Sequence, residues 1–246
     1  MARYQIILIY DGTDFAGYQR QIGKRTVQGE VEAALRRLGW AGKTIQAAGR
    51  TDAGVHAAGQ VIACNLDWNH APEALQRALN ANLPSDLAAK SVRLADPDFH
   101  PRYDARERRY RYRLVCDAVR DPLRNRYAWQ VWPAPELPLL QQAASALLGK
   151  HDFSAFGAPV RPGGSTRRTV FAAEWQAHAD ELWFEIRGDA FLYHMVRRLV
   201  FALVEVGRRR MAIEAFAACL NNPPAEPPQG LAPAQGLTLM EAVYPL

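Results

Sequence analysis

The chain has few cysteines, few lysines and no long apolar run. Its 246 residues include only three cysteines, with no C-x-x-C spacing. This argues against a disulfide framework or a cysteine-zinc site and favours the reducing cytoplasm. The early apolar run Ile6–Tyr10 is too short for a membrane span or a signal-peptide core. With 49% hydrophobic and 22% charged residues, the chain has the composition of a globular protein with a substantial core, which excludes disorder as its main state.

Several well-known catalytic motifs are also missing. The sequence has no H-E-x-x-H zinc motif, no deaminase pair of H-x-E with P-C-x-x-C, no G-x-S-x-G elbow and no G-x-G-x-x-G fingerprint. A glycosidase that pairs Asp52 with Asp11 or Asp14 stays open, although nothing in the sequence favours it.

The positive charge is unevenly placed. Only four of the 30 basic residues are lysines, and 26 are arginines, whose planar donors suit phosphate and stack on bases. Residues 101–130 hold nine arginines against four acids, a surplus that equals the net charge of +5 of the whole chain. Such clustering favours a localised anionic partner. Solvated arginine-rich faces would explain the arginine bias but not the clustering.

The first part of the chain alternates between strand and helix patterns. Thr26 is a typical helix N-cap, and Pro72 suits the first turn of a helix. In chain order we expect a strand over Tyr4–Ile9, a helix from Thr26 to Gly39, strands over Thr44–Ala48 and Gln60–Asn65, a helix from Pro72, and a strand over Ala88–Leu94. The order β-α-β-β-α-β is typical of a ferredoxin-like unit.

The second part repeats this pattern with extra elements. The expected strands are Glu107–Cys116, Tyr127–Trp132, Val170–His178, Leu182–Arg187 and Leu237–Tyr244, and the expected helices are Glu136–Leu148, Phe191–Val206 and Ile213–Leu220. We therefore predict an α+β fold of two tandem ferredoxin-like (βαββαβ) halves, forming a continuous, mostly antiparallel sheet flanked by helices, with a central cleft. Residues 1–98 would form the first half, and residues 99–246 the half that carries the basic strand and the apolar helix.

The stretch Gly49-Arg50-Thr51-Asp52-Ala53-Gly54-Val55-His56 falls in the loop between two predicted strands. Two glycines flank a carboxylate, so the backbone can turn sharply and approach a ligand. The glycine spacing resembles a phosphate-binding P-loop, but Val55-His56 stands where that motif needs Lys and then Ser or Thr. On these grounds alone, Asp52 is more often a turn former than a catalyst.

The basic strand alternates arginine with aromatic residues. Arg109, Arg111 and Arg113 would share one face, and Tyr110, Tyr112 and Leu114 the other. One face could follow phosphates while the other presents a ring to a base. The alternative is a strand with its tyrosines in the core and its arginines in water.

The predicted helix Phe191–Val206 begins with a basic edge. His194, Arg197 and Arg198 stand at i, i+3 and i+4, so a helix would place them together. The edge either meets an anionic group or is solvated. Expected core residues of this helix are Phe191, Met195, Leu199 and Ala202.

Gly49–Ala57 closely resembles the active-site motif of the tRNA pseudouridine synthase A family. The resemblance covers nearly the whole chain, and its further motifs follow in the right order: Tyr10–Thr13, Thr26–Gly29, Asn80–Pro84, Asp98–His100, Arg109–Tyr112, His194–Arg197 and Gly236–Leu239. Tyr18 stands where the family usually has Trp, which we interpret as a packing substitution. No role is assigned to the loops Pro159–Ser165 and Pro223–Pro228.

The resemblance implies an isomerase, an intramolecular transferase that converts uridine to pseudouridine at positions 38, 39 and 40 of the anticodon stem-loop of tRNA. It implies no metal and no cofactor. It also implies a cytoplasmic homodimer in which one tRNA touches both subunits.

The resemblance also assigns roles to single residues. Asp52 is the expected catalytic carboxylate and nucleophile, with Arg197 as its ion-pair partner. Arg50 would displace the target base or hold the space it leaves. Tyr110 would stack on the uracil, and Leu239 would form an apolar wall beneath it. From the residues themselves, Arg111 and Arg113 are expected to bind the tRNA backbone.

The resemblance leaves the course of the reaction open. Whether Asp52 attacks C1′ or C6, or acts through a glycal-type intermediate, cannot be read from residues, and neither can the preferred uridine. The main rival is a tRNA-binding protein or RNA chaperone with the same fold and no chemistry. Binding alone needs no unique carboxylate, so Asp52, Tyr110 and Arg197 together favour the enzyme.

Overall fold

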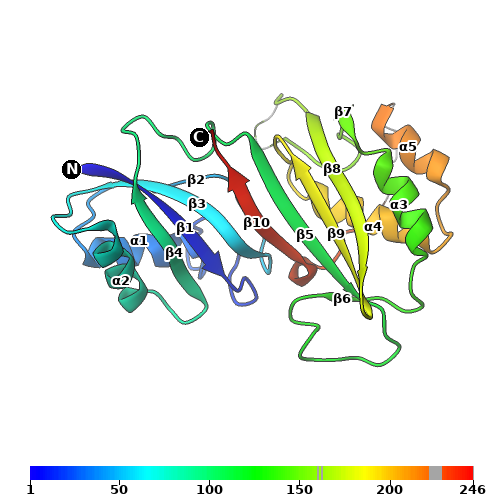
Figure 1. The fold of residues 1–246 in the computed structure, drawn as a ribbon, viewed down its shortest axis with the longest axis horizontal. Coiled ribbons are helices and arrows are strands. Elements are labelled where there is room, and N and C mark those ends of the chain that lie inside the picture. Colours follow the sequence, from blue (N-terminus) through cyan, green and yellow to red (C-terminus); the bar gives the residue numbers. More distant parts are fainter. Residues whose placement is uncertain (160, 162, 222–228, 246) are drawn as a thin grey trace. The chain divides into compact units, whose positions relative to one another are not determined.

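The computed structural model describes residues 1–159, 161, 163–221 and 229–245 (Figure 1). Pro223–Pro228, one of the loops without a role, lies outside the described residues. The chain divides into two compact units, Met1–Arg106 with Thr238–Leu246, and Glu107–Leu237. Each unit is a mixed α+β structure with a mostly antiparallel sheet, which confirms the predicted fold class. The predicted continuous sheet and central cleft concern the placement of the units and stay predictions.

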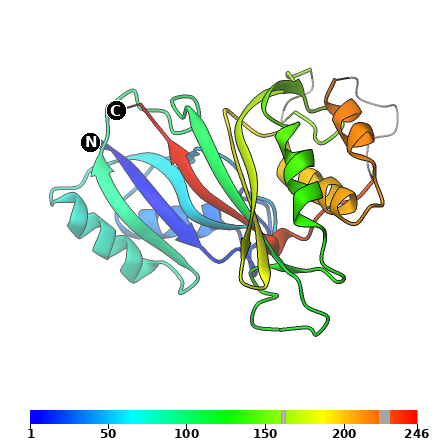
Figure 2. The same cartoon turned by 45° about the vertical axis from the view of Figure 1, so that its right-hand side comes forward.

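The first unit contains the predicted β-α-β-β-α-β order. Its strands pair in the order β4-β1-β3-β10, with β2 beside β3, and every pair is antiparallel except β10 with β3 (Figures 1 and 2). The elements are β1 (Ala2–Tyr10), α1 (Val27–Arg37), β2 (Gln46–Ala47), β3 (His56–Leu66), α2 (Pro72–Asn82), β4 (Leu87–Leu94) and β10 (Leu237–Val243).

Local signals in the sequence explain this unit. The Thr26 hydroxyl accepts the Gly29 N–H at 3.3 Å and caps α1, as expected. The apolar face of that helix, including Val31 and Leu35, is fully buried. In the sheet, Ile6 of β1 lies opposite Ile62 of β3, and both side chains are fully buried. Apolar residues at helical spacing in α1 and along β1 and β3 therefore form the buried core of this unit.

The C-terminal strand belongs to the first unit. In β10, Leu239 lies opposite Ala57 of β3 in parallel register. The Arg106 N–H donates to the Val243 carbonyl at 2.8 Å, at the end of the same strand. The sequence prediction of a single boundary after residue 98 differs from this division, because local periodicity carries no signal for pairing between segments about 180 residues apart.

The second unit has the strand order β5-β9-β8-β7, all antiparallel, with β6 parallel to β5. Helix α3 packs against β8 and α4. No helix in the described part of the chain has both the length and the apolarity to cross a membrane. The elements are β5 (Glu107–Val115), β6 (Trp129–Gln130), α3 (Leu137–Ser145), β7 (Gly149–Asp152), β8 (Arg167–His178), β9 (Glu181–Gly188), α4 (Met195–Gly207), α5 (Ile213–Asn221) and the 3-10 turn η1 (Ala234–Gly236).

One local prediction for this unit was wrong, and one strand was missed. The long helix begins at Met195 rather than at Phe191, because His194 adopts the left-handed conformation, with φ of 64°. A non-glycine residue in that conformation cannot continue a right-handed helix. His194 therefore lies before the helix and is not part of its basic edge. The short strand β7 was not predicted, since Gly149–Asp152 has no apolar alternation.

Candidate functional site

The segment Gly49–Val55, here called the motif loop, connects β2 to β3 in the first unit. Asp52 is half-buried near its middle, between exposed residues Arg50 and Ala53 and next to the buried Thr51. The Val55 N–H donates to the Asp52 carbonyl at 3.2 Å and closes the turn. Asp52 therefore stands at a sharp turn on the rim of the first unit's core, as the two flanking glycines predict.

Gly12 and Gly17, in the loop that connects β1 to α1, lie directly against the motif loop. A Cβ atom on Gly12 would lie 2.0 Å from the Val55 carbonyl oxygen. Gly17 has φ of 94°, and its Cβ would lie 3.0 Å from the Thr51 carbonyl oxygen. That carbonyl also accepts the Tyr18 N–H at 3.0 Å. Only residues without a side chain fit both positions, so the two loops are held together by backbone contact.

Buried side chains hold the first part of the motif loop, from Gly49 to Thr51. The Tyr10 hydroxyl shares a hydrogen bond of 2.8 Å with the Thr51 hydroxyl, and the Gln60 side-chain amide donates to the Gly49 carbonyl at 2.9 Å. Burial raises the pKa of Tyr10 to about 12, against the opposing effect of hydrogen bonds with Thr51 and Gln60. The phenol therefore stays protonated at neutral pH, and the residue before Asp52 keeps its hydrogen bond.

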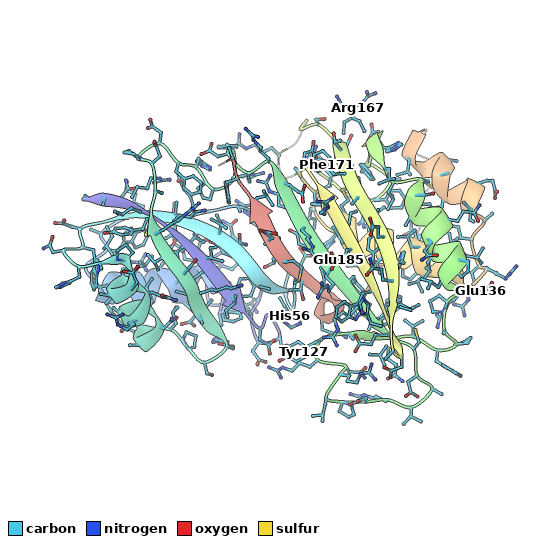
Figure 3. The ribbon with its side chains drawn as sticks, viewed as in Figure 1. His56, Tyr127, Glu136, Arg167, Phe171 and Glu185 are labelled. Carbon is cyan, nitrogen blue, oxygen red and sulfur yellow. The ribbon has the colours of Figure 1, made fainter. Side chains whose placement is uncertain are left out.

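His56, the first residue of β3 (labelled in Figure 3), contacts the same loop between β1 and α1. Its Nδ1 accepts the Gly12 N–H at 3.0 Å and lies 3.1 Å from the Asp11 carboxylate. Asp11 in turn accepts the backbone and side-chain donors of Thr13. The imidazole of the motif therefore orients the 11–13 turn, a role that the sequence alone did not indicate.

Leu239, the expected apolar wall, lies on β10 beside the start of β3. It is fully buried and pairs with Ala57, the residue after His56. Leu239 thus belongs to the same unit as Asp52, and its predicted contact with a base stays a prediction.

Tyr110 lies on β5 of the second unit, with only 9% of its surface exposed. Its ring meets the Phe191 ring edge to face, with centroids 5.2 Å apart. The segment Asp189–His194, here called the β9–α4 loop, carries Phe191 and is anchored by Arg108, which donates to the Asp189 carbonyl at 2.7 Å. Asp189 also accepts the Thr169 N–H at 3.0 Å. The loop therefore supports Tyr110 from one side. The sequence did not predict this contact, because Phe191 was expected to begin a helix.

Arg197 lies in the first turn of α4 and is half-buried. Its Nε donates to the Ala232 carbonyl at 2.8 Å, and its own carbonyl accepts the Ala232 N–H at 3.2 Å. These contacts tie α4 to the segment that precedes β10. Asp52 belongs to the first unit and Arg197 to the second, so their ion pair stays a prediction.

Arg109, Arg111 and Arg113 share one face of β5, as their spacing predicts. Glu185 of β9, which is labelled in Figure 3, accepts from the Nε atoms of Arg109 and Arg111, each at 2.8 Å. Glu181, also on β9, accepts from Nε of Arg113 at 2.8 Å. We call this surface the arginine face; it consists of Arg109, Arg111, Arg113, Glu181, Trp183 and Glu185. Its glutamates lie outside residues 101–130, so the charge surplus of that segment is partly neutralised in the fold.

The ion pairs of the arginine face lower the pKa values of its two carboxylates, Glu181 and Glu185. Burial alone would raise the pKa of Glu181, but hydrogen bonds from Arg113, Trp183 and Arg124 lower it to about 2. Glu185 shows the same balance, with burial outweighed by Arg111 and Arg109, which lower its pKa. The Arg111 guanidinium also lies 4.3 Å from the centre of the Trp183 ring. The face is therefore an ordered network rather than a row of solvated side chains.

The described residues contain no group of three or more His, Cys, Asp or Glu side chains that could hold a metal ion.

Comparisons with known proteins lead to the same family as the motif around Asp52. A family model described as tRNA pseudouridine synthase matches residues 6–104 and 143–245. A protein of Moorella thermoacetica named tRNA pseudouridine synthase A is 42% identical over 242 residues, covering 98% of both chains. Proteins of the same name from Shouchella clausii and Brevibacillus brevis are each 41% identical and cover 99% of this chain, with 94% and 100% of their own lengths matched. This chain belongs to the tRNA pseudouridine synthase family.

Proposed function

We propose that this chain is an isomerase that converts uridine to pseudouridine at positions 38, 39 and 40 of the anticodon stem-loop of tRNA. The observation that carries the proposal is Asp52, a carboxylate on a loop held by Gly12, Gly17 and the Tyr10–Thr51 hydrogen bond. Family membership supplies the substrate class. A rigid loop suits a catalytic carboxylate, because small displacements of a reacting group cost large factors in rate.

The reaction breaks the bond between C1′ and N1 of uridine, rotates the uracil and joins C1′ to C5. The C5 proton leaves, so a carbon-bound label at that position is released with each turnover. Asp52 provides the negative charge, as a nucleophile that later leaves or as the group that stabilises a glycosyl intermediate. Both routes need its carboxylate in a fixed position.

The other site residues bind and orient the nucleotide. Exposed Arg50 has room to displace the target base or hold the space it leaves. Tyr110, supported by Phe191, stacks on the uracil and assists removal of the C5 proton. Arg197 pairs with Asp52, and Leu239 forms the apolar wall beneath the base. Arg111 and Arg113 contact the tRNA backbone. The enzyme acts in the cytoplasm as a homodimer, with one tRNA touching both subunits.

The proposal is tested with tRNA transcripts tritiated at C5 of uridine. We expect release from a transcript with uridines at 38, 39 and 40, and none above background when these three are cytidine. Asp67, an exposed carboxylate with 80% of its side chain accessible, serves as a control for Asp52. Replacing Asp67 by Ala should leave tritium release within about twofold of the parent.

Release that persists without uridines at 38–40 would reject the assigned positions. No release from either transcript, with binding retained on a filter, would reject the enzyme in favour of a non-catalytic tRNA-binding protein.

A further inference from the structure

The β9–α4 loop ends in two aromatic rings that lie face to face. The rings of Tyr193 and His194 have centroids 3.7 Å apart and planes 25° from parallel. Tyr193 is 57% exposed, whereas the next residue after the pair, Met195, is fully buried. An exposed tyrosine backed by a second ring offers a flat apolar surface to solvent.

The backbone holds this pair in place. The left-handed conformation of His194 turns the chain just before α4. The Tyr193 N–H donates to the Ala158 carbonyl at 3.0 Å, and the two residues form an isolated β-bridge. Gly157 lies close by, since a Cβ there would be 2.8 Å from the Tyr193 carbonyl oxygen. The rings are therefore presented by an ordered backbone, which lowers the entropic cost of binding a planar ligand.

A cation lies one helical turn beyond the pair. The Arg198 N–H donates to the His194 carbonyl at 3.0 Å, so Arg198 lies in the first turn of α4, directly after the pair. Within the described residues, the Arg198 guanidinium has no carboxylate at ion-pair distance. Its neighbour Arg197 differs, since Nε of Arg197 donates to the Ala232 carbonyl. Arg198 is thus available to pair with an anionic ligand.

We propose that Tyr193 and Arg198 form a nucleotide subsite for the anticodon arm, with an unpaired base stacked on Tyr193 and its phosphate bound by Arg198. The inference rests on the proposed function for its ligand. Stacking on an aromatic ring tolerates any base, and arginine matches the geometry of phosphate. Tyr193 stands two residues after Phe191, which contacts Tyr110, so the subsite receives a nucleotide adjacent to the target uridine.

A sequence-tolerant subsite suits the three target positions. The neighbours of uridines 38, 39 and 40 differ from one position to the next and from one tRNA to another. Hydrogen-bond readout of a neighbouring base would favour particular sequences, whereas stacking does not. Tyr193 therefore binds the RNA next to each target uridine without selecting its sequence.

The test measures binding without turnover. The probe is an anticodon stem-loop RNA with cytidine at positions 38, 39 and 40 and with 2-aminopurine in its loop, whose emission falls when it stacks. We expect Tyr193→Ala to raise Kd about 10-fold and to remove the quenching, while Tyr193→Phe keeps Kd within about twofold. Arg198→Gln should lower the slope of log Kd against log salt by about one.

Matched variants control for folding and for surface tyrosines in general. Tyr193→Leu keeps apolar bulk without a ring, so it should bind as weakly as Tyr193→Ala. Tyr103→Ala removes another exposed tyrosine next to a histidine, in the first unit, and should bind within about twofold of the parent. Melting temperatures of all variants should match that of the parent.

An unchanged Kd for Tyr193→Ala, or equal losses for Tyr193→Phe and Tyr193→Ala, would overturn the subsite. Because the probe contains no target uridine, loss of the proposed isomerisation would leave these differences in Kd intact. Isomerisation with unaltered binding by Tyr193→Ala would reject the subsite alone.

Discussion

The motif loop and the arginine face hold charged side chains by opposite means. Asp52 owes its position to backbone contacts with Gly12 and Gly17 and to a hydrogen bond between the neutral side chains of Tyr10 and Thr51. Arg111 and Arg113 are held by carboxylates from the neighbouring strand β9. The first arrangement positions an anion through the backbone of its loop, and the second fixes cations through ion pairs that neutralise part of their charge.

The difference indicates that the motif loop suits catalysis and that the arginine face suits tRNA binding. A carboxylate on a loop placed by backbone contacts is held in a fixed position relative to an electron-poor centre in a substrate. Arginines already paired with glutamates exchange one anion for another when a phosphate arrives, so each contributes less to affinity than a solvated arginine would. We therefore expect changes in the motif loop to alter turnover, and changes in the arginine face to alter stability and salt dependence.

The largest expected effect follows from Gly12→Ala. The added Cβ would lie 2.0 Å from the Val55 carbonyl oxygen, so the motif loop must move and carry Asp52 with it. We expect turnover under saturating tRNA to fall about 100-fold, because such displacements misplace the reacting group. Kd for tRNA should change much less, as measured by filter binding.

Gly23→Ala is the control for backbone strain. Gly23 has φ of 68°, but nothing lies within 4 Å of its Cβ position. Turnover should stay within about twofold of the parent. Equal losses in both variants would mean that close approach to Val55 does not matter.

The next effect concerns acid stability and Glu181. The pKa of Glu181 is lowered from 4.5 to about 2 in the folded chain, so its stabilising effect is complete above pH 4.5 and is lost as pH falls toward 2. Glu181→Gln should lower the free energy of unfolding by about 2 kcal/mol at neutral pH, and the difference from the parent should shrink at low pH. Urea unfolding at neutral pH and at about pH 3 measures it.

Glu174→Gln, which removes an exposed carboxylate from β8, serves as the matched variant. It should change the free energy of unfolding by less than about 0.5 kcal/mol. If the free energy of unfolding differed between Glu181→Gln and the parent by the same amount at all pH values, the ion pairs of Glu181 would not be the cause of that difference.

A smaller effect is expected from the arginines themselves. Replacing Arg111 and Arg113 together by Gln should weaken tRNA binding several-fold and lower the slope of log Kd against log salt by about one to two. Glu185→Gln should do the reverse, since it releases Arg109 and Arg111 from their carboxylate. Salt titrations of tRNA binding measure both. Unaltered slopes in the two variants would show that the arginine face does not touch the tRNA backbone.

The smallest effect is expected from Tyr10→Phe. It removes the hydroxyl that bonds to Thr51, at a cost of about 1 kcal/mol in the free energy of unfolding. Turnover should fall a few-fold while tRNA affinity stays unchanged, because the loop keeps its glycine contacts. A loss as large as that of Gly12→Ala would mean that this hydrogen bond, rather than the backbone contact, places Asp52.

Local patterns predicted most of the fold. Thr26 caps its helix as expected, and the alternation in Glu107–Val115 sorts tyrosines from arginines onto opposite faces. Both depend on neighbouring residues and can be read along the chain. The helix predicted from Phe191 failed because helical spacing continues through His194, whose backbone turns into the left-handed region.

The site was predictable only in part. The motif around Asp52 is local and can be read from the sequence, whereas the roles of Tyr110 and Arg197 come from family resemblance and stay predictions. The packing of Gly12 against Val55, and of Phe191 against Tyr110, joins segments about 40 and 80 residues apart and leaves no periodic signal. Glu181 and Glu185 were missed for the same reason, since pairing of β5 with β9 decides which charges meet.

The most direct test of the account compares turnover and binding in Asp52→Asn, which keeps the shape of the side chain and removes its charge. We predict that tritium release from C5-labelled tRNA falls to background in single-turnover reactions. Kd for the same tRNA should stay within about threefold of the parent, since Asp52 acts on the reacting sugar or base rather than on the tRNA backbone. Release at the parent rate would contradict the assignment of Asp52 as the catalytic carboxylate.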